Sequence, residues 1–163
     1  MNEQFIIGAI VKNHFGVLTR VSSLFSRRGY NIDSLVVGVT ENPEYSRMTI
    51  AAAGDEQVRR QVVNQLQKLH DVVRADIIPM ENANLREHML IKLTTGAGIN
   101  AEITNIINRF GAKVIDFGAQ SITAEVTGSP ESNGKFLELA APYGILEVCR
   151  AGVQALHRGA ETL

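Results

Sequence analysis

The sequence has a single cysteine, Cys149, and no tryptophan, and its first residues lack the basic start and apolar stretch of a secretion signal. One cysteine cannot form a disulfide within the chain, so an apolar core has to hold the fold together. These absences predict a protein of a reducing compartment, and we expect it to be cytoplasmic. Because Cys149 lies in an apolar run, we expect its thiol to be an inert core group.

Neither sign of charge dominates, since 16 Lys and Arg residues face 17 Asp and Glu residues for a net charge of −1. This balance argues against a protein whose main task is to bind nucleic acid or an anionic membrane through bulk charge. No apolar run approaches the ~20 residues that a membrane-spanning helix requires. Apolar residues make up 45% of the 163 residues, enough for a packed core in one medium domain or two small ones.

The first half of the sequence alternates between strand and helix patterns. Apolar or alternating runs predict strands at residues 5–11, 32–39, 47–53 and 72–78. Helical spacing of apolar residues begins near Gly16 and ends at Gly29, and a second helix is expected to start with Asp55 as its cap. This order is that of a ferredoxin-like domain, a four-stranded antiparallel sheet with two helices on one face.

The same pattern returns in the second half. We predict strands at residues 89–94, 114–117, 121–127 and 145–149, helices at 99–110 and 131–141, and a short terminal helix at 151–163. Gly16 and Gly98 are 98 − 16 = 82 residues apart, and Gly29 and Gly111 are 111 − 29 = 82 apart. The sequence therefore predicts an α+β protein of two ferredoxin-like βαββαβ domains, residues 1–80 and 88–163, joined by a polar linker at 81–87.

Catalytic patterns are scarce. The four histidines and Cys149 do not have the spacing of a metal site, no serine lies in a nucleophile elbow, and the glycines near residue 98 form no phosphate-binding loop. The third predicted strand, 47–53, has no aromatic residue for stacking RNA bases. An enzyme or a nucleic-acid-binding module is therefore less favoured than a regulatory module, whose sheet edge can pair with a second chain.

The predicted turn between the first strand and the first helix is the most informative segment. Gly16 lets the backbone approach a ligand closely, and the first N–H groups of the helix, with the positive end of its dipole, suit a carboxylate. We interpret this turn as the site of a small amino acid that acts as a regulatory signal. The structural alternative is that Gly16 only eases a tight connection, that nearby asparagines satisfy turn backbone, and that nearby apolar residues are core.

Three runs of the sequence carry a resemblance to a known family. Residues 16–21 (GVLTRV), 24–35 (LFSRRGYNIDSL) and 46–50 (SRMTI) closely resemble the small regulatory subunit of acetolactate synthase, also called acetohydroxyacid synthase. The likeness continues more loosely through residues 85–92 and 147–159 and so covers essentially the whole chain. The N-terminal half of that family is an ACT domain, a ligand-sensing form of the ferredoxin-like fold.

The resemblance implies a non-catalytic partner of a large thiamin-diphosphate enzyme. That enzyme condenses pyruvate with pyruvate or 2-ketobutyrate at the start of branched-chain amino-acid synthesis. The small subunit would activate the catalytic subunit and confer feedback inhibition by valine or another branched-chain amino acid. Thiamin diphosphate, magnesium and any FAD would belong to the catalytic subunit, so we expect no cofactor and no metal on this chain.

The resemblance also implies a homodimer whose effector sites lie between two ACT domains. One chain would contribute its strand-to-helix turn and the other the start of its second strand. The effector-binding residues carried over by position are Asn13, Gly16, Val17, Leu18, Asn31 and Ile32. Phe15 lies where the family varies, which leaves selectivity among valine, leucine and isoleucine open. The competing hypotheses are an ACT-type sensor of another ligand and a small-molecule enzyme on the ferredoxin-like fold.

Overall fold

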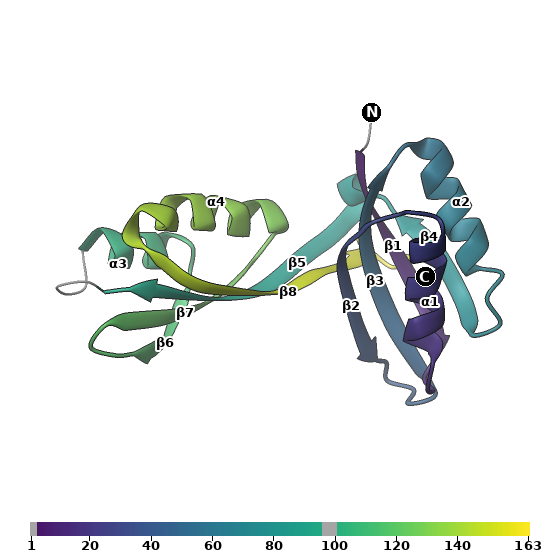
Figure 1. The fold of residues 1–163 in the computed structure, drawn as a ribbon, viewed down its shortest axis with the longest axis horizontal. Helices are drawn as coiled ribbons and strands as arrows, with labels where there is room; N and C mark the ends of the chain where they lie inside the picture. The colour runs from purple at the N-terminus through teal and green to yellow at the C-terminus, as the bar shows by residue number, and fades with distance from the viewer. Residues whose placement is uncertain (1–2, 96–100) are drawn as a thin grey trace. The chain divides into compact units, whose positions relative to one another are not determined.

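The computed structural model describes residues 3–95 and 101–163, which form two compact units. The first unit runs to Asn84 and includes Val153–Leu163, and the second is Leu85–Gly152. In chain order the elements are β1 (Glu3–Lys12), α1 (Val17–Arg27), β2 (Ile32–Val39), β3 (Tyr45–Gly54), α2 (Glu56–Leu66), β4 (Val72–Ile78), the 3-10 helix η1 (Met80–Asn82), β5 (Ala83–Thr94), α3 (Ala101–Arg109), β6 (Lys113–Phe117), β7 (Ser121–Gly128), α4 (Pro130–Ala140), the 3-10 helix η2 (Ala141–Tyr143) and β8 (Ile145–His157) (Figure 1). None of the helices in these ranges has the length and apolar character needed to span a membrane.

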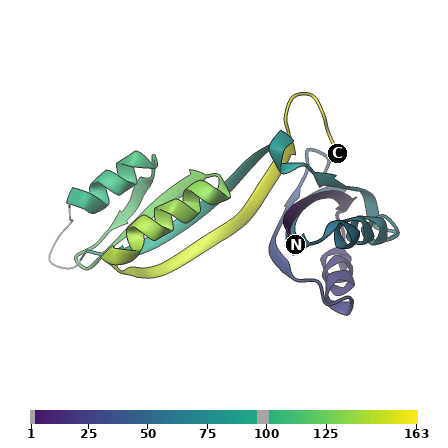
Figure 2. The same cartoon turned by 90° about the horizontal axis from the view of Figure 1, so that it is seen from above.

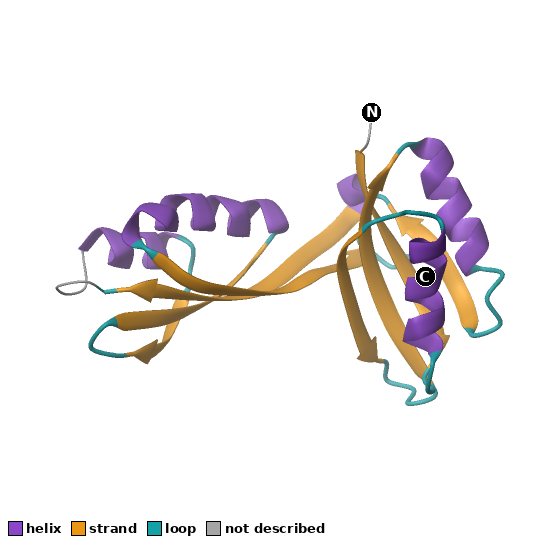
Figure 3. Ribbon diagram, in the orientation of Figure 1, coloured by secondary structure: helices purple, strands orange, loops and turns teal. Residues whose placement is uncertain are grey.

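Each unit is built on a four-stranded sheet, and the two sheets share one topology. The strand order is β2-β3-β1-β4 in the first sheet and β6-β7-β5-β8 in the second. Figure 3 distinguishes the helices from the strands by colour. Figure 2 shows that α1 and α2 lie on the same side of the first sheet. The predicted α+β class with two ferredoxin-like βαββαβ domains is confirmed.

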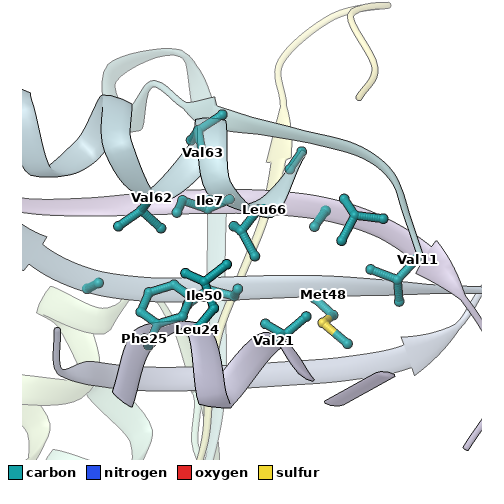
Figure 4. Close-up of a cluster of buried hydrophobic side chains, with 14 of the residues drawn as sticks. Ile7, Val11, Val21, Leu24, Phe25, Met48, Ile50, Val62, Val63 and Leu66 are labelled. Atoms are coloured by element: carbon teal, nitrogen blue, oxygen red, sulfur yellow. The ribbon is translucent and has the colours of Figure 1, made fainter. Parts of the chain in front are cut away.

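The core of the first unit lies between its sheet and its two helices (Figure 4). Alternate residues of β1 and β3 point toward the helices, as a period of two requires for a half-covered sheet. The helices pack against these residues with apolar side chains spaced three and four positions apart. The buried side chains that meet there include Ile7 and Val11 of β1, Met48 and Ile50 of β3, Val21, Leu24 and Phe25 of α1, and Val62, Val63 and Leu66 of α2.

The expected helix signals take their predicted roles. Gly29 follows α1 with φ +68°, and Gly111 follows α3 with φ +63°, so both adopt the left-handed conformation that ends a helix. The Asp55 side chain accepts a 2.8 Å hydrogen bond from the backbone N–H of Val58 and caps α2. Gly98, the predicted counterpart of Gly16, lies outside the described residues.

The predicted terminal helix at residues 151–163 is wrong. Strand β8 instead continues from Ile145 to His157, and the chain beyond it is not helical. The buried positions alternate along the end of the strand, with Val153 6% exposed and Ala155 1% exposed. Pairing with β5, together with contacts to the first sheet, thus overrides the local preference of this Ala- and Leu-containing segment for helix.

The segment predicted as a linker, residues 81–87, contains the end of η1 and the beginning of β5. Its polar composition suggested a solvated connection, yet Glu87 is only 5% exposed and pairs with Arg150 of β8. Cys149, expected to be a core thiol, is exposed on β8. In both segments the polar or apolar character of the run does not show which side chains of the strand are buried against the rest of the unit.

The end of β8 and the residues after it cover the face of the first sheet that the helices leave open. The Arg47 guanidinium of β3 donates from Nη2 to the carbonyl oxygen of Ala155 at 2.6 Å. The side chain of Leu163 packs against Gly8 of β1, so closely that a Cβ there would meet Leu163 Cδ1 at 2.5 Å. The first unit is therefore a three-layer structure of helices, sheet and C-terminal segment.

Candidate functional site

Gly16 occupies the turn between β1 and α1 in a conformation that favours glycine. Its φ is +89° and its ψ is −10°, and it is the N-cap of α1 without any side-chain hydrogen bond at the cap. A Cβ built on Gly16 would find no heavy atom within 4 Å, so the backbone angle and not lack of space requires glycine here. The first N–H groups of a helix have no acceptor within it, and no side chain caps α1 at Gly16, so the start of this helix is of the kind that suits a small anionic group.

Asn13 ties this turn to the neighbouring turn between β2 and β3. Its backbone N–H donates to the Glu44 carbonyl at 2.7 Å, and its side-chain Nδ2 donates to the Pro43 carbonyl at 2.9 Å. Its Oδ1 accepts a 3.1 Å hydrogen bond from the Ser46 hydroxyl. The Asn13 amide thus fixes the turn, which is the structural role that the sequence left open for it.

The two residues after Gly16 face opposite ways. Val17 is 4% exposed and packs into the core of the first unit, whereas Leu18 is 47% exposed. Phe15, before the glycine, is fully exposed. Of the predicted aliphatic lining, Leu18 can reach a ligand with its side chain, and Val17 can reach one only through its backbone.

Asn31 and Ile32 lie at the opposite end of the same sheet. Ile32 pairs with Ala52, which in turn pairs with Phe5 near the start of β1. The Gly16 turn instead follows Lys12 at the end of β1, ~20 Å further along the strand direction. Asn31 is exposed and donates from Nδ2 to Asp33 Oδ1 at 2.8 Å, and Ile32 packs partly against the core. One chain therefore does not bring the six predicted residues into one site.

Sequence reasoning missed a charged cluster beside the turn. The Asp71 side chain, 5% exposed, lies just before β4 and accepts from Arg20 of α1 and from His14 of the turn, whose Nε2 is 3.0 Å from Asp71 Oδ1. His70 Nδ1 lies 3.4 Å from the same oxygen. Burial raises the pKa of Asp71, but the hydrogen bonds from Arg20 and His70 and the charges of Arg20 and His14 outweigh it, so the pKa lies below its ordinary value.

The order of the strands could have revealed this cluster. β4 is next to β1, and the backbone N–H of Lys12 donates to the Asp71 carbonyl at 2.8 Å. A residue that precedes β4 must therefore lie beside the residues that follow β1. Among the residues that the structure describes, no group of three or more His, Cys, Asp and Glu side chains is arranged to hold a metal ion.

Comparison with known proteins connects both units to one family. A family model described as the AHAS small subunit-like ACT domain matches residues 7–74, and one described as the small subunit of acetolactate synthase matches residues 86–159. The acetolactate synthase small subunit of Mycolicibacterium smegmatis is 42% identical over 94% of this chain and 90% of its own length. The chain belongs to the acetolactate synthase small subunit family.

Other relatives extend this membership. A probable acetolactate synthase small subunit from Methanothermobacter thermautotrophicus is 40% identical over 97% of this chain and 95% of its own length. The crystal structure of the small subunit from Thermotoga maritima superposes with a TM-score of 0.89 at 32% identity, over 98% of this chain and 99% of that one. As a member of the acetolactate synthase small subunit family, the chain is a regulatory ACT-domain subunit of branched-chain amino-acid biosynthesis and not the catalytic one.

Proposed function

We propose that this chain binds a branched-chain amino acid, with valine as the first candidate, at the Gly16 turn. Through that site it confers feedback inhibition on the large catalytic subunit of acetolactate synthase, which it also activates. Thiamin diphosphate, magnesium and any FAD are assigned to the catalytic subunit, and this chain is assigned no cofactor. We place the complex in the cytoplasm.

The chemistry of the turn supports this proposal. A free amino acid needs donors for its carboxylate, acceptors for its ammonium group and an apolar surface for its side chain. The N–H groups at the start of α1 are suited to the carboxylate, and the half-exposed Leu18 offers an apolar surface beside them. An aliphatic surface separates ligands that differ by one methylene by only ~1–3 kcal/mol, so leucine and isoleucine are expected to compete with valine.

The strand register is the observation that best supports a site formed by two chains. β2 is an edge strand of the first sheet, and it ends at the same end of the sheet as the Gly16 turn. Antiparallel pairing of β2 with β2 of a second copy puts the start of one strand beside the end of the other. Asn31 and Ile32 of one chain are then adjacent to Gly16 and Leu18 of its partner.

The exposed side of β2 is consistent with such pairing. Val37 is 42% exposed and Val39 is 60% exposed, on the same side of the strand as Leu35, which packs partly against the core. An unpaired apolar edge is a template for a second strand unless something blocks it. We therefore propose a homodimer through the ACT domains with two equivalent effector sites.

The test combines activity, binding and oligomeric state. Acetolactate formation by the catalytic subunit is measured with and without this chain and with added valine, and valine binding to the isolated chain is measured by calorimetry. Val37→Lys is expected to yield a monomer that loses valine binding. Val73→Lys, at a position 57% exposed on the other edge strand β4, is the matched control and should change neither property.

Three results would overturn the proposal. A wild-type chain that leaves acetolactate formation unchanged is not a regulatory subunit of that enzyme. A chain that activates the enzyme but binds a different amino acid is the alternative ACT-type sensor. A monomeric Val37→Lys chain that still binds valine normally would show that one chain contains the whole site.

A further inference from the structure

The Asp71 carboxylate connects three segments that border the Gly16 turn. His14 belongs to the turn itself, Arg20 lies one helical turn after Gly16 on α1, and Asp71 immediately precedes β4. Both oxygens of the carboxylate are used: Oδ1 by His14 and His70, and Oδ2 by Arg20. The Asp71 side chain is 5% exposed, while those of His14 and Arg20 are 46% and 57% exposed.

Backbone hydrogen bonds hold Asp71 and the turn in fixed relation. The Lys12 N–H donates to the Asp71 carbonyl at 2.8 Å, so the residue is attached to the end of β1 as well as to the side chains around it. The Arg20 N–H donates to the Gly16 carbonyl at 3.1 Å, which makes Arg20 part of the first turn of α1. His14 and Arg20 therefore flank Gly16 in the sequence and are both anchored on one buried acceptor.

We propose that Asp71 is a positioning residue of the effector site. It acts through His14 and Arg20, which hold the Gly16 turn in the conformation that directs the N–H groups of Val17 and Leu18 toward the ligand. This inference rests on the proposed function and deepens it, because it assigns the geometry of the site to a residue 55 positions beyond Gly16 (71 − 16 = 55). The buried carboxylate does not itself contact the effector.

The physical reason is preorganisation. A site made of backbone amides binds an anion well only if those amides already point at one place, because ordering them on binding costs affinity. Gly16 has a wide choice of backbone angles and cannot fix the turn alone. Charge-assisted hydrogen bonds from His14 and Arg20 to a largely water-excluded carboxylate are strong enough to restrict the turn on both sides of Gly16.

The principal variant is Asp71→Asn, which keeps the size of the side chain but removes its charge. Its affinity for L-valine, measured by calorimetry on the full-length chain, is expected to fall roughly tenfold, the scale of losing one charge-assisted hydrogen bond. Hydrogen exchange in peptides that cover residues 13–18 is expected to become faster at the same time. Activation of the catalytic subunit without valine is expected to persist.

Glu87→Gln is the matched control, since Glu87 is another carboxylate of 5% exposure that is paired with an arginine, and its side chain lies in the second unit. A purely structural loss should affect the stability of both variants, whereas faster exchange at residues 13–18 and weaker valine binding should be specific to Asp71→Asn. His14→Gln and Arg20→Met remove the two partners of Asp71 that flank Gly16. Together they should reproduce the Asp71→Asn effect even if that variant folds poorly.

The readouts separate the two proposals. If the wild-type chain binds no valine, the proposed effector fails, and exchange at residues 13–18 alone decides the role of Asp71. Unchanged exchange at residues 13–18 in Asp71→Asn and in the double variant would overturn the positioning role. Faster exchange with unchanged valine affinity would also overturn it, because the turn conformation would then not matter for the ligand.

Discussion

Arg150 holds both carboxylate oxygens of Glu87, with Nε 2.9 Å from Oε1 and Nη2 2.6 Å from Oε2. Asn133 of α4 donates a further hydrogen bond to Oε2 at 3.1 Å. The pair joins β5 to β8 within the second unit, and its planar, two-bond geometry is the kind that contributes most among ion pairs. The hydrogen bond to Glu87 raises the pKa of Arg150 despite the opposing effect of its burial.

Arg150→Met is expected to destabilise the chain by about 1–3 kcal/mol, because it leaves the buried Glu87 carboxylate with fewer donors. The lower part of that range is favoured, since the Arg150 side chain is 42% exposed and water can replace part of what is lost. Chemical denaturation measures the change. Lys135→Met breaks the exposed Glu131–Lys135 pair and should have no measurable effect, and an equal loss there would contradict this account.

Gly16→Asp is expected to abolish valine sensitivity while leaving activation of the catalytic subunit largely intact. A negative charge at this position opposes a carboxylate at the start of α1, and a side chain at φ +89° adds strain of ~1 kcal/mol. Gly16→Asn is the matched control, because asparagine has nearly the same size, tolerates the left-handed conformation and carries no charge. Acetolactate assays with a valine titration distinguish them, and loss of activation with inhibition preserved would refute the prediction.

The lowered pKa of Asp71 predicts that part of the chain's stability is lost at acid pH. Because the pKa of Asp71 is lower in the folded chain than its ordinary value, the ionised form is favoured by folding. Its contribution is therefore present at pH values above the ordinary aspartate range and is lost as pH falls through the lowered pKa. Unfolding midpoints measured from neutral pH down to pH ~3 should fall less steeply in Asp71→Asn than in the wild type.

Glu131→Gln serves as the control for that titration. The pKa of Glu131 is also lowered, by the hydrogen bond and charge of Lys135, but its side chain is 78% exposed and the interaction is screened by water. Its acid-limb slope should match that of the wild type. Identical slopes in Asp71→Asn and the wild type would show that the Asp71 cluster contributes nothing to the pH dependence.

Gly8→Ala is expected to loosen the C-terminal segment from the first sheet. A Cβ at Gly8 would lie 2.5 Å from Leu163 Cδ1 and 2.9 Å from Ile78 Cδ1, so both side chains must move. Overpacking of this kind costs ~1–3 kcal/mol. Leu163→Ala in the same chain should recover part of the loss, and Gly38→Ala, where a Cβ meets nothing within 4 Å, should cost far less. Additive losses in a double-mutant cycle would argue against the contact.

Local patterns were sufficient to predict most of the fold. The β-branched runs gave β2 at Ile32–Val39 and β4 at Val72–Ile78 with the bounds that the structure has. Gly29 and Asp55 marked helix ends because their roles depend only on neighbouring backbone. The end of β8 could not be predicted in this way, since its strand partner β5 and the first-sheet residue that it contacts, Arg47, both lie far back in the chain.

The candidate site was predictable only in part, for the same reason. The position of Gly16 at the turn before α1 depends only on its own backbone angle, so the sequence was enough to predict that turn. The contacts of Asp71 with His14 and Arg20 span 57 and 51 residues and depend on β4 lying beside β1. Asn13 stays a predicted ligand contact, and the partners that its amide has within the chain, Pro43 and Ser46, could not be read from the local sequence. Long-range neighbours decide what such side chains do.

The separation of Gly16 from Ile32 along one sheet has a genetic consequence under the proposed pairing. Every complete pocket combines the Gly16 turn of one copy with the start of β2 of the other. A chain defective at its turn and a chain defective at the start of β2 are each insensitive alone, yet a mixed pair of the two contains one pocket built from both intact ends. An allele damaged at the Gly16 turn and one damaged at the start of β2 would thus complement one another, whereas two alleles damaged at the same one of these sites would not.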